Sequence, residues 1–386
     1  MREPDWPTAR TMAGSGKVLP AERVPLIAAD NRLLAEDARS LTDLPAFDTS
    51  AMDGWAVNGD GPWTVDGEVL AGTAPPAQVL PGHAYGIATG AAVPPGSMGI
   101  VRRENGHLSD GRLETDAPVN DDIRPAGQEC RVGEVLAGKG TWLDPATIGL
   151  LAAAGLDEVE VRAKPRVAVV LFGDELVGSG VAGPGFVRDS LGPQVPGWLR
   201  RMGAEVVSMT VVSDTLQAHV DAIAQAAASA DIVMTTGGTA AGPVDHLHTA
   251  VRELSGQFLV DSVAVRPGHP MAMADLGTAW LVALPGNPQS AIVSLLTLGE
   301  PLVNSMLGLM QRPLPEVILA EAAKAPATEH RLLASRLVEG RAEPVRHLGS
   351  AMLRGLSVAD GFAVLPPGGA SAGTSVQWLG LPQYGR

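Results

Sequence analysis

The sequence predicts a multidomain chain with a doubly wound α/β domain at its centre. Three apolar runs support this prediction, at residues 167–170, 232–234 and 280–284, and each ends at a turn that contains glycine. A helix is expected directly after the last turn, over residues 288–295. Because ligands of open parallel sheets sit beyond the carboxyl ends of the strands, these turns predict a binding site. The first N–H groups of helix 288–295 are expected to be free to attract an anion.

Length, composition and charge narrow the class of protein. A chain of 386 residues is too long for one core and predicts about two to four domains. Its 45% hydrophobic and 18% charged residues are typical of a folded globular protein. The formal net charge of −14 opposes attraction to a phosphate backbone, so we expect no nucleic-acid partner.

Cysteine usage and hydropathy predict the compartment. Cys130 is the single cysteine, which excludes an intramolecular disulfide and a cysteine-rich metal site. No run approaches the roughly 18 apolar residues of a membrane span, and the first residues lack an apolar signal core. We therefore expect a soluble, cytoplasmic protein with no membrane partner.

The N-terminal part is predicted to be a linker domain, formed by residues 1–43 and 131–163, that carries an inserted module. Residues 1–41 are expected to be helical, because apolar residues of 21–36 recur at mixed three- and four-residue spacing. A second helix is expected over 144–154, because Asp144 suits its N-cap and Pro145 its first position. Between these pieces, residues 44–130 are expected to form a β-rich module, since short apolar runs alternate with Gly and Pro.

The rest of the chain is predicted to form two domains. From residue 164 to 311, strands alternate with helices, which predicts a doubly wound α/β domain. Within it, an amphipathic helix is expected over 214–228, with Leu216, Val220, Ile223 and Ala227 on one face. Residues 312–386 hold short apolar runs separated by Gly and Pro, which predict a small C-terminal β-barrel.

Carboxylates occur at several of the predicted turns. Asp53 lies in the turn DTSAMDGWAV, where Gly54 lets the backbone approach a ligand; the alternative is a turn held by its own Asx hydrogen bonds. Asp174 and Glu175 follow the first sheet strand and could ligate Mg²⁺, or could cap the next helix. Asp245 follows the second sheet strand and could return a carboxylate to the same place.

Glycine turns and basic side chains offer an anion site. Successive N–H groups in the TTGG turn at 235–238 could form an anion nest, although such turns are also common without a function. The loop RPGHP at 266–270 offers a guanidinium and an imidazole as an oxyanion clamp; the alternative is an edge turn with a solvated arginine. His246 and His248 are expected to be ordinary polar residues, because alternate helical positions diverge.

Two reaction classes are disfavoured. No Gly-x-Ser-x-Gly or Walker pattern occurs, and the loops at 121–130 and 266–270 do not pair a nucleophile with an evident base. Covalent acyl transfer and P-loop hydrolysis are therefore not expected.

Taken in order, these motifs resemble the molybdopterin molybdenumtransferase family, the MoeA and gephyrin E-domain group. The matching segments are LPAFDTSAMDGWAV (44–57), ATGAAVPPG (88–96), IRPAG (123–127), GDEL (173–176), TTGG (235–238) and LPGNP (284–288). The resemblance covers about residues 18–380, and the SAMDG and LPGNP motifs are specific in combination.

The resemblance implies an architecture and a reaction. Four-domain chains would form an elongated homodimer, with a cleft between the α/β domain of one protomer and the inserted module of the other. Molybdate would be inserted into adenylylated molybdopterin, a small pterin nucleotide, with Mg²⁺ present and AMP released. A molybdopterin adenylyltransferase would act upstream. Such a site needs oxygen ligands for the cation and preorganised positive charge for phosphate and molybdate.

Residue chemistry and the resemblance together assign the site. The catalytic set is Asp53, Thr89, Glu129, Glu175 and Asp245, of which Glu175 and Asp245 would hold the metal. The cofactor-binding set is Thr236, Gly237, Gly238, Arg266, His269, Pro285, Gly286, Asn287, Pro288 and Ser350.

The sequence departs from the family pattern at several positions. Arg266 and His269 stand where the family has two lysines, so anion attraction is expected to weaken there. Glu129 occupies an aspartate position with a longer reach, and Gln128 beside it is uncharged. Further changes remove a hydroxyl or an amide, at Phe172, Ala240 and Leu191.

Three hypotheses follow from these observations. We favour an active molybdenumtransferase with altered ligand contacts, because Glu175, Asp245 and the turn glycines are retained. The alternative is a degenerate paralogue that binds a pterin nucleotide or a partner protein without inserting metal. A gephyrin-like scaffold is disfavoured, since the long linker and extra domain of that role are not found in this sequence.

Overall fold

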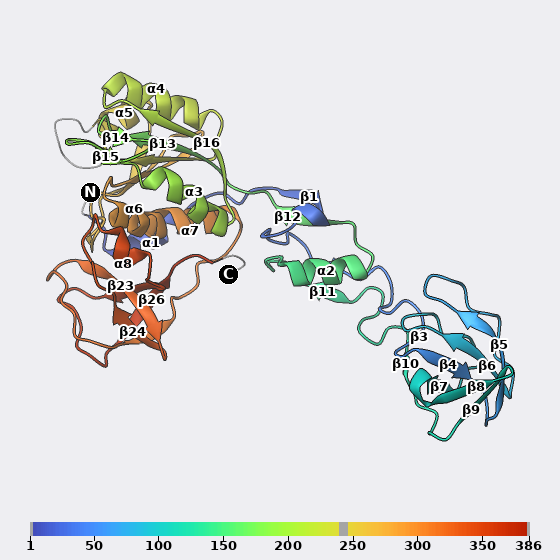
Figure 1. Ribbon diagram of the computed structural model, residues 1–386. Helices are drawn as coiled ribbons and strands as arrows, with labels where there is room; N and C mark the ends of the chain where they lie inside the picture. The colour runs from blue at the N-terminus through green and yellow to red at the C-terminus, as the bar shows by residue number, and fades with distance from the viewer. Residues whose placement is uncertain (1–2, 239–245, 384–386) are drawn as a thin grey trace. The chain divides into compact units, whose positions relative to one another are not determined.

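The computed structural model describes residues 3–238 and 246–383 (Figure 1). The chain divides into two compact units. The first unit comprises residues 1–22, 31–35 and 161–386, and the second comprises 23–30 and 36–160. Among the described residues, none of the helices has the length and apolar character needed to cross a bilayer.

A six-stranded sheet forms the centre of the first unit, in the order β16-β13-β17-β21-β20-β18. The first four strands are parallel to one another, and β20 is antiparallel to both of its neighbours. The strands are β13 (Arg166–Phe172), β16 (Glu205–Val212), β17 (Ile232–Thr236), β18 (Gln257–Asp261), β20 (Ala272–Asp275) and β21 (Trp280–Leu284). The three predicted apolar runs are thus adjacent parallel strands, buried on both faces as such strands require.

Helices cover both faces of this sheet, so the predicted doubly wound fold is confirmed. Figure 1 shows α4 (Leu216–Ala227) and α5 (Leu247–Glu253) on one face. The other face carries α3 (Leu191–Arg201), α6 (Pro288–Ser294), α7 (Glu300–Met306) and α1 (Trp6–Ala13). A π-helical turn, η3 (Leu295–Gly299), connects α6 to α7.

The predicted apolar face of helix α4 is also confirmed. Ile223 is fully buried against Val170 and Phe172 of β13, and Leu216 and Val220 pack against the same core. Thr215 begins the helix, because its hydroxyl accepts a hydrogen bond from the N–H of Ala218 at 3.3 Å.

Of the helical structure expected over residues 1–41, α1 is present, but the helix expected over 21–36 is wrong. The structure has strand β1 (Ala21–Pro25) and a short 3₁₀ turn, η1 (Leu26–Ala28); β1 forms a two-stranded sheet with β12 (Glu158–Arg162). Pro25 gives the physical reason, because its ring removes a donor and would clash with the preceding turn of a helix.

The second unit contains a six-stranded sheet in the order β7-β4-β6-β5-β9-β8, which confirms the predicted β-rich character. Its strands are β4 (Gly54–Val57), β5 (Trp63–Val69), β6 (His83–Ile87), β7 (Gly99–Arg102), β8 (Gly106–Ser109) and β9 (Arg112–Thr115), with the 3₁₀ turn η2 (Arg103–Asn105). Short ribbons pair β3 (Thr49–Ser50) with β10 (Ile123–Arg124), and β2 (Ala38–Arg39) with β11 (Val135–Ala137). Buried apolar residues fill both faces of the large sheet.

Helix α2 (Pro145–Ala153) of the second unit begins where the sequence predicts. The carboxylate of Asp144 accepts a hydrogen bond from the N–H of Thr147 at 2.7 Å, and Pro145 follows as the first helical residue. This hydrogen bond lowers the pKa of Asp144 below its usual value.

A closed barrel of five strands completes the first unit, as the C-terminal sequence predicts. Its strands are β22 (Glu316–Leu319), β23 (His330–Val338), β24 (Arg341–Pro344), β25 (Gly361–Leu365) and β26 (Ser375–Gly380). Pairing of β23 with β25 closes the ring around a core that includes Leu333 and Trp378. The loops add helix α8 (Leu353–Leu356), and elsewhere in the unit β14 (Leu176–Val177) pairs with β15 (Val187–Arg188).

The two-residue strand β19 (Val265–Arg266) ties the barrel to the α/β domain. It pairs in parallel with β23 and aligns Arg266 with Arg331. The predicted oxyanion loop therefore lies against the barrel, which brings side chains distant in sequence to one place.

Candidate functional site

Glycine turns meet at the carboxyl ends of the parallel strands. The N–H of Gly237 donates to the carbonyl of Leu284 at 3.0 Å, and a Cβ built on Gly286 would lie 3.8 Å from the Cα of Gly237. Gly237 and Gly238 have φ values of +83° and +64°, in the left-handed region. A Cβ on Gly237 would also lie only 2.8 Å from the carbonyl oxygen of Phe172. The TTGG turn therefore depends on glycine at position 237.

A cavity of about 310 Å³ opens at the LPGNP turn, within the first unit. It collects five residues that the sequence assigns to ligand binding, namely Arg266, His269, Pro285, Asn287 and Ser350. The RPGHP loop, the end of β21 and a barrel loop thus contribute to one site.

Two further polar residues line this cavity, and the sequence analysis missed both of them. Arg331 lies beside Arg266 through the β19–β23 pairing, and its Nη1 donates to the carbonyl of Lys324 at 2.7 Å. The pairing of so short a strand cannot be predicted from a sequence pattern. Ser290 lies in the first turn of α6, two residues after the LPGNP motif. Its position so close to the motif in sequence could have indicated that it lines the site.

Both basic residues of the RPGHP loop are paired with carboxylates. Arg266 donates through Nε and Nη2 to Glu329, at 2.7 and 3.1 Å. His269 Nε2 lies 2.7 Å from Glu3 Oε1. Arg266 is 53% exposed and its charge is compensated by Glu329, so the choice between an oxyanion clamp and an edge turn with a solvated arginine stays a prediction.

A loop of the barrel bonds the first N–H groups of helix α6. The carbonyl of Ser350 accepts hydrogen bonds from the N–H groups of Gln289 and Ser290, at 2.9 and 3.4 Å. The expectation that these N–H groups are free for an anion is therefore wrong. An anion in the cavity would depend mainly on side chains.

Two departures from the family pattern are buried. The ring of Phe172 stacks on that of His219, with centroids 3.6 Å apart and an interplanar angle of 8°. His219 meets the ring of His246 edge-on at 5.4 Å. Leu191 is also buried and begins α3, where its N–H donates to Asp189 at 2.9 Å. The third position, Ala240, lies outside the described residues.

Glu175 is exposed at the end of β13. Its carboxylate folds back over Gly173, where a Cβ would lie 2.9 Å from Glu175 Oε2. The alternative that Asp174 and Glu175 cap the next helix is wrong, because α3 begins at Leu191 and Asp189 caps it.

The metal assignment depends on the carboxylate of Glu175. Over 3–238 and 246–383, no three His, Cys, Asp or Glu side chains form a group that could hold a metal ion, and Asp245 lies outside those ranges. One exposed carboxylate nevertheless fits Mg²⁺, which takes one or two carboxylates together with substrate phosphate and water.

Asp53 and Thr89 come together in the second unit. The N–H of Thr89 donates to Asp53 Oδ1 at 2.7 Å, and hydrogen bonding from Thr89 holds the pKa of the Asp53 carboxyl below its usual value. Asp48 accepts instead from the N–H of Ala126 at 2.8 Å. The alternative of internal Asx hydrogen bonds is therefore wrong for both carboxylates. Gly54 is required next to Asp53, because a Cβ there would lie 2.0 Å from the carbonyl of Val101.

Other assigned residues have simpler surroundings. Glu129 is exposed, and its N–H donates to the carbonyl of Leu44 at 2.8 Å. Thr236 is only 2% exposed, so its side chain belongs to the buried part of β17. His248 Nε2 lies 2.7 Å from Asp261 Oδ1. The roles assigned to Glu129 and Thr236 stay predictions.

Models of known families match nearly the whole chain. The MoeA N-terminal region, domains I and II, matches residues 8–155; a probable molybdopterin binding domain matches 168–305; and the MoeA C-terminal region, domain IV, matches 316–381. The chain is 34% identical over 381 residues to the molybdopterin molybdenumtransferase of Synechococcus elongatus, covering 93% of this chain and 94% of the relative. The chain belongs to the molybdopterin molybdenumtransferase family. The family predicted from the motifs is confirmed.

Further members support the same assignment. The molybdopterin molybdenumtransferase of Haemophilus influenzae is 34% identical over 292 residues, covering 73% of this chain and 72% of the relative. A crystal structure of a molybdopterin biosynthesis MoeA protein from Pyrococcus horikosii has a TM-score of 0.79 at 26% identity, covering 98% of this chain and 99% of that one. The multidomain fold is therefore that of the family.

Proposed function

We propose that this molybdenumtransferase inserts molybdate into adenylylated molybdopterin and releases AMP in an Mg²⁺-dependent reaction. The cavity at the LPGNP turn carries the proposal. Two guanidinium groups, from Arg266 and Arg331, and the imidazole of His269 line it together with the hydroxyls of Ser290 and Ser350. Positive charge and hydrogen-bond donors fixed in advance are what a tetrahedral oxyanion requires.

The pterin nucleotide would lie beyond the ends of β17 and β21. Gly237, Gly238 and Gly286 carry no side chain there, so phosphate groups can approach the main chain closely, although the N–H of Gly237 is already bonded to the carbonyl of Leu284. Asn287 and Ser350 would bind polar groups of the same ligand from the cavity side. We expect a molybdopterin adenylyltransferase to supply this substrate in the cytoplasm.

Carboxylates from both units would complete the site. Glu175 and Asp245 would hold Mg²⁺, which stabilises charge on the phosphates while the anhydride is cleaved. Asp53, ionised and oriented by Thr89, would act on the same ligand from the inserted module of the second protomer of a homodimer. Glu129 would contribute from that module as well.

The alternative is a family member that binds the pterin nucleotide, or a partner protein, without inserting metal. One observation favours it. Arg266 and His269, the residues that replace two lysines of the family, are both paired with carboxylates, which weakens their attraction for an anion.

Release of AMP tests the proposal. The purified chain, incubated with adenylylated molybdopterin, Mg²⁺ and molybdate, should release AMP, and omission of Mg²⁺ or molybdate should stop the reaction. Arg331→Ala should lose this activity because it removes a cation from the cavity, whereas Arg336→Ala, an exposed arginine on the same strand, should retain it. Tight binding of the pterin nucleotide without AMP release would favour the alternative.

A further inference from the structure

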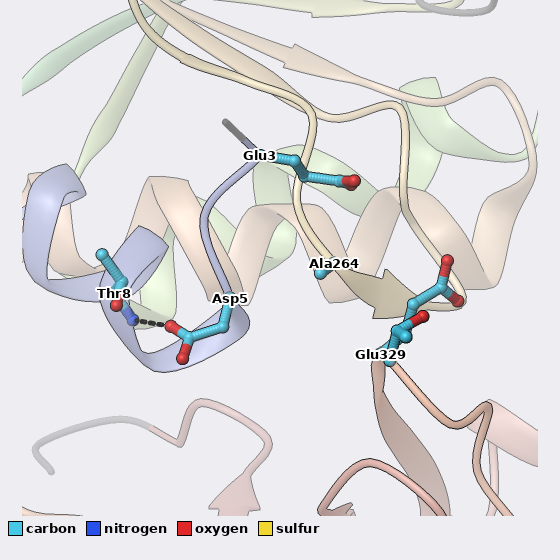
Figure 2. Close-up of a pocket in the computed structure, with 6 residues that line it drawn as sticks. Glu3, Asp5, Thr8, Ala264 and Glu329 are labelled. Atoms are coloured by element: carbon cyan, nitrogen blue, oxygen red, sulfur yellow. Dashed lines mark hydrogen bonds between the residues drawn. The ribbon is translucent and has the colours of Figure 1, made fainter. Parts of the chain in front are cut away.

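Two carboxylates outside the assigned site contact basic residues that line the oxyanion cavity. Glu3 lies in the segment before α1, and Glu329 directly precedes β23. Both line a second cavity, of about 510 Å³, together with Asp5, Thr8, Ala264 and Thr328. Figure 2 shows Glu3 and Asp5 on the N-terminal segment and Glu329 on the other side of Ala264.

The N-terminal segment is held in place by main-chain contacts. The N–H of Ala264 donates to the carbonyl of Pro4 at 3.0 Å, and Asp5 forms a parallel bridge with Ala264. Asp5 also caps α1, accepting from the N–H of Thr8 at 2.9 Å (Figure 2). Since Ala264 immediately precedes β19, these contacts fix Glu3 beside the RPGHP loop.

Each carboxylate bonds one basic side chain of that loop. Glu329 is 16% exposed and accepts two hydrogen bonds from Arg266, whose own side chain is 53% exposed, so solvent screens this pair from the arginine side. Glu3 and His269 are each about one-third exposed, with 2.7 Å between Oε1 and Nε2. A carboxylate at this distance opposes the attraction that the basic group would exert on a second anion.

Arg331 differs from these two residues. Arg331 is one of the residues that line the oxyanion cavity, and the acceptor found for its guanidinium is the main-chain carbonyl of Lys324, which carries no formal charge. The positive charge of the cavity therefore resides mainly on Arg331.

We propose that Glu3 and Glu329 are positioning residues that restrain His269 and Arg266 and so set the oxyanion affinity of the cavity. An incoming oxyanion must compete with two fixed carboxylates for these basic groups, while Arg331 attracts it without such competition. This inference rests on the proposed function, because it assumes that the cavity takes an oxyanion.

Calorimetric titration of the full chain with molybdate, and separately with inorganic phosphate, tests the inference. Glu3→Gln and Glu329→Gln keep the size of the side chain and a hydrogen-bond acceptor but remove the charge. Each should lower the Kd roughly two- to fivefold, the effect expected of partly exposed ion pairs. Glu205→Gln is the matched control, since Glu205 lies at the opposite, amino-terminal end of the parallel strands; its Kd should not change.

A gain in affinity separates this role from a structural one, because damage to the fold does not tighten binding. In the AMP assay, the same variants should lower the KM for molybdate without raising kcat. If Glu329→Gln lowers the melting temperature, Glu3→Gln carries the test alone.

The outcomes distinguish the inference from the proposed function. Tightening for either oxyanion supports the inference, and the oxyanion affected identifies molybdate or phosphate as the occupant. If the wild-type chain binds an oxyanion and Arg331→Ala abolishes that binding, but neither glutamine variant tightens it, only the inference is overturned. If neither the wild-type chain nor any variant binds an oxyanion, the inference is overturned, whereas the proposed function is overturned by absence of AMP release.

Discussion

At the scale of single residues, Phe172 illustrates how a change of side chain is absorbed by its neighbour. The family usually has a serine or threonine at position 172. Here the phenylalanine ring is 3% exposed and stacks on the ring of His219 beneath the glycine turn. Arg266 and His269 are likewise matched by Glu329 and Glu3. Each residue that differs from the family pattern therefore has to be interpreted together with the side chain that it contacts.

Asp53→Asn should reduce AMP release by roughly 10²-fold or more, because it removes a charge held next to the reacting ligand. The asparagine oxygen can still accept from the N–H of Thr89, and the side chain is exposed, so the melting temperature should not change. The AMP assay and a thermal melt measure the two effects. Asp48→Asn is the control, and full activity of the Asp53 variant would remove Asp53 from the catalytic set.

His330 should make stability depend on pH. Burial lowers the pKa of its imidazole, and the nearby charge of Asp5 opposes that shift only in part. As the pH falls below about 6.5, the unfolded chain takes up the proton before the native state does, so stability decreases. Above that pH the effect is absent.

Urea unfolding of the wild type and of His330→Gln at about pH 7.5 and pH 5.5 measures this effect, because these values lie about one unit either side of the ordinary histidine pKa of roughly 6.5. The midpoint should fall less with acidification in the variant. His107→Gln, an exposed histidine, is the control and should behave as the wild type does. Equal acid sensitivity in all three proteins would contradict the assignment to His330.

At the scale of elements, the two glycine turns at the ends of the parallel strands differ in how well they tolerate a side chain. The backbone of Gly237 lies in the left-handed region and close to the carbonyl of Phe172. Gly286, in the neighbouring turn, has a negative φ and its nearest neighbour for a Cβ is 3.8 Å away. The two turns are adjacent, yet their demands on sequence differ.

Gly237→Ala should destabilise the protein by about 1–3 kcal/mol, the cost of a strained backbone and a close contact. Gly286→Ala should change stability by less than about 0.5 kcal/mol, because the new methyl group meets only an ordinary contact. Equilibrium denaturation of both variants measures the difference. Similar losses in the two would show that the φ of Gly237 is not the cause.

The elements also show why sequence analysis succeeded in part. Strands β13, β17 and β21 and helix α4 were predicted because continuous apolar runs and helical periodicity are local signals. The apolar residues of segment 21–36 also have helical spacing, but Pro25 prevents a helix there. The prediction considered the spacing and not the proline.

Long-range pairing explains the rest of the difference. Arg331 reaches the cavity only because β19 pairs with β23, and Ser350 closes α6 only because a barrel loop returns to it. Asp53 and Thr89 were assigned by resemblance to the family, whereas the hydrogen bond between them was found only in the structure. Local pattern and family resemblance together assigned five of the residues that line the cavity and missed Arg331 and Ser290.

At the scale of the whole molecule, the assigned residues are divided between two units. Asp53 and Thr89 belong to the second unit, and Glu175, Arg266 and the glycine turns belong to the first. In the proposed homodimer, each site would take one unit from each chain. Symmetric dimers of this kind allow two different defects to complement each other.

Mixing Asp53→Asn with Glu175→Gln should therefore restore AMP release. Each variant alone is expected to be inactive, but a mixed dimer has one site built from the two intact units, so random mixing should give about one quarter of wild-type activity. Chains must be unfolded and refolded together, or coexpressed, so that they exchange. Activity that stays at the level of the single variants would mean that both residues act within one chain.

The pairing of β19 with the barrel has a consequence for shortened relatives of this chain. A protein that ended near residue 311 could keep every strand of the parallel sheet and still lose the guanidinium of Arg331 and the carbonyl that seals α6. Such a truncated homologue would retain the glycine turns yet bind tetrahedral anions poorly. The last seventy or so residues are thus better regarded as one wall of the pocket than as an appendage.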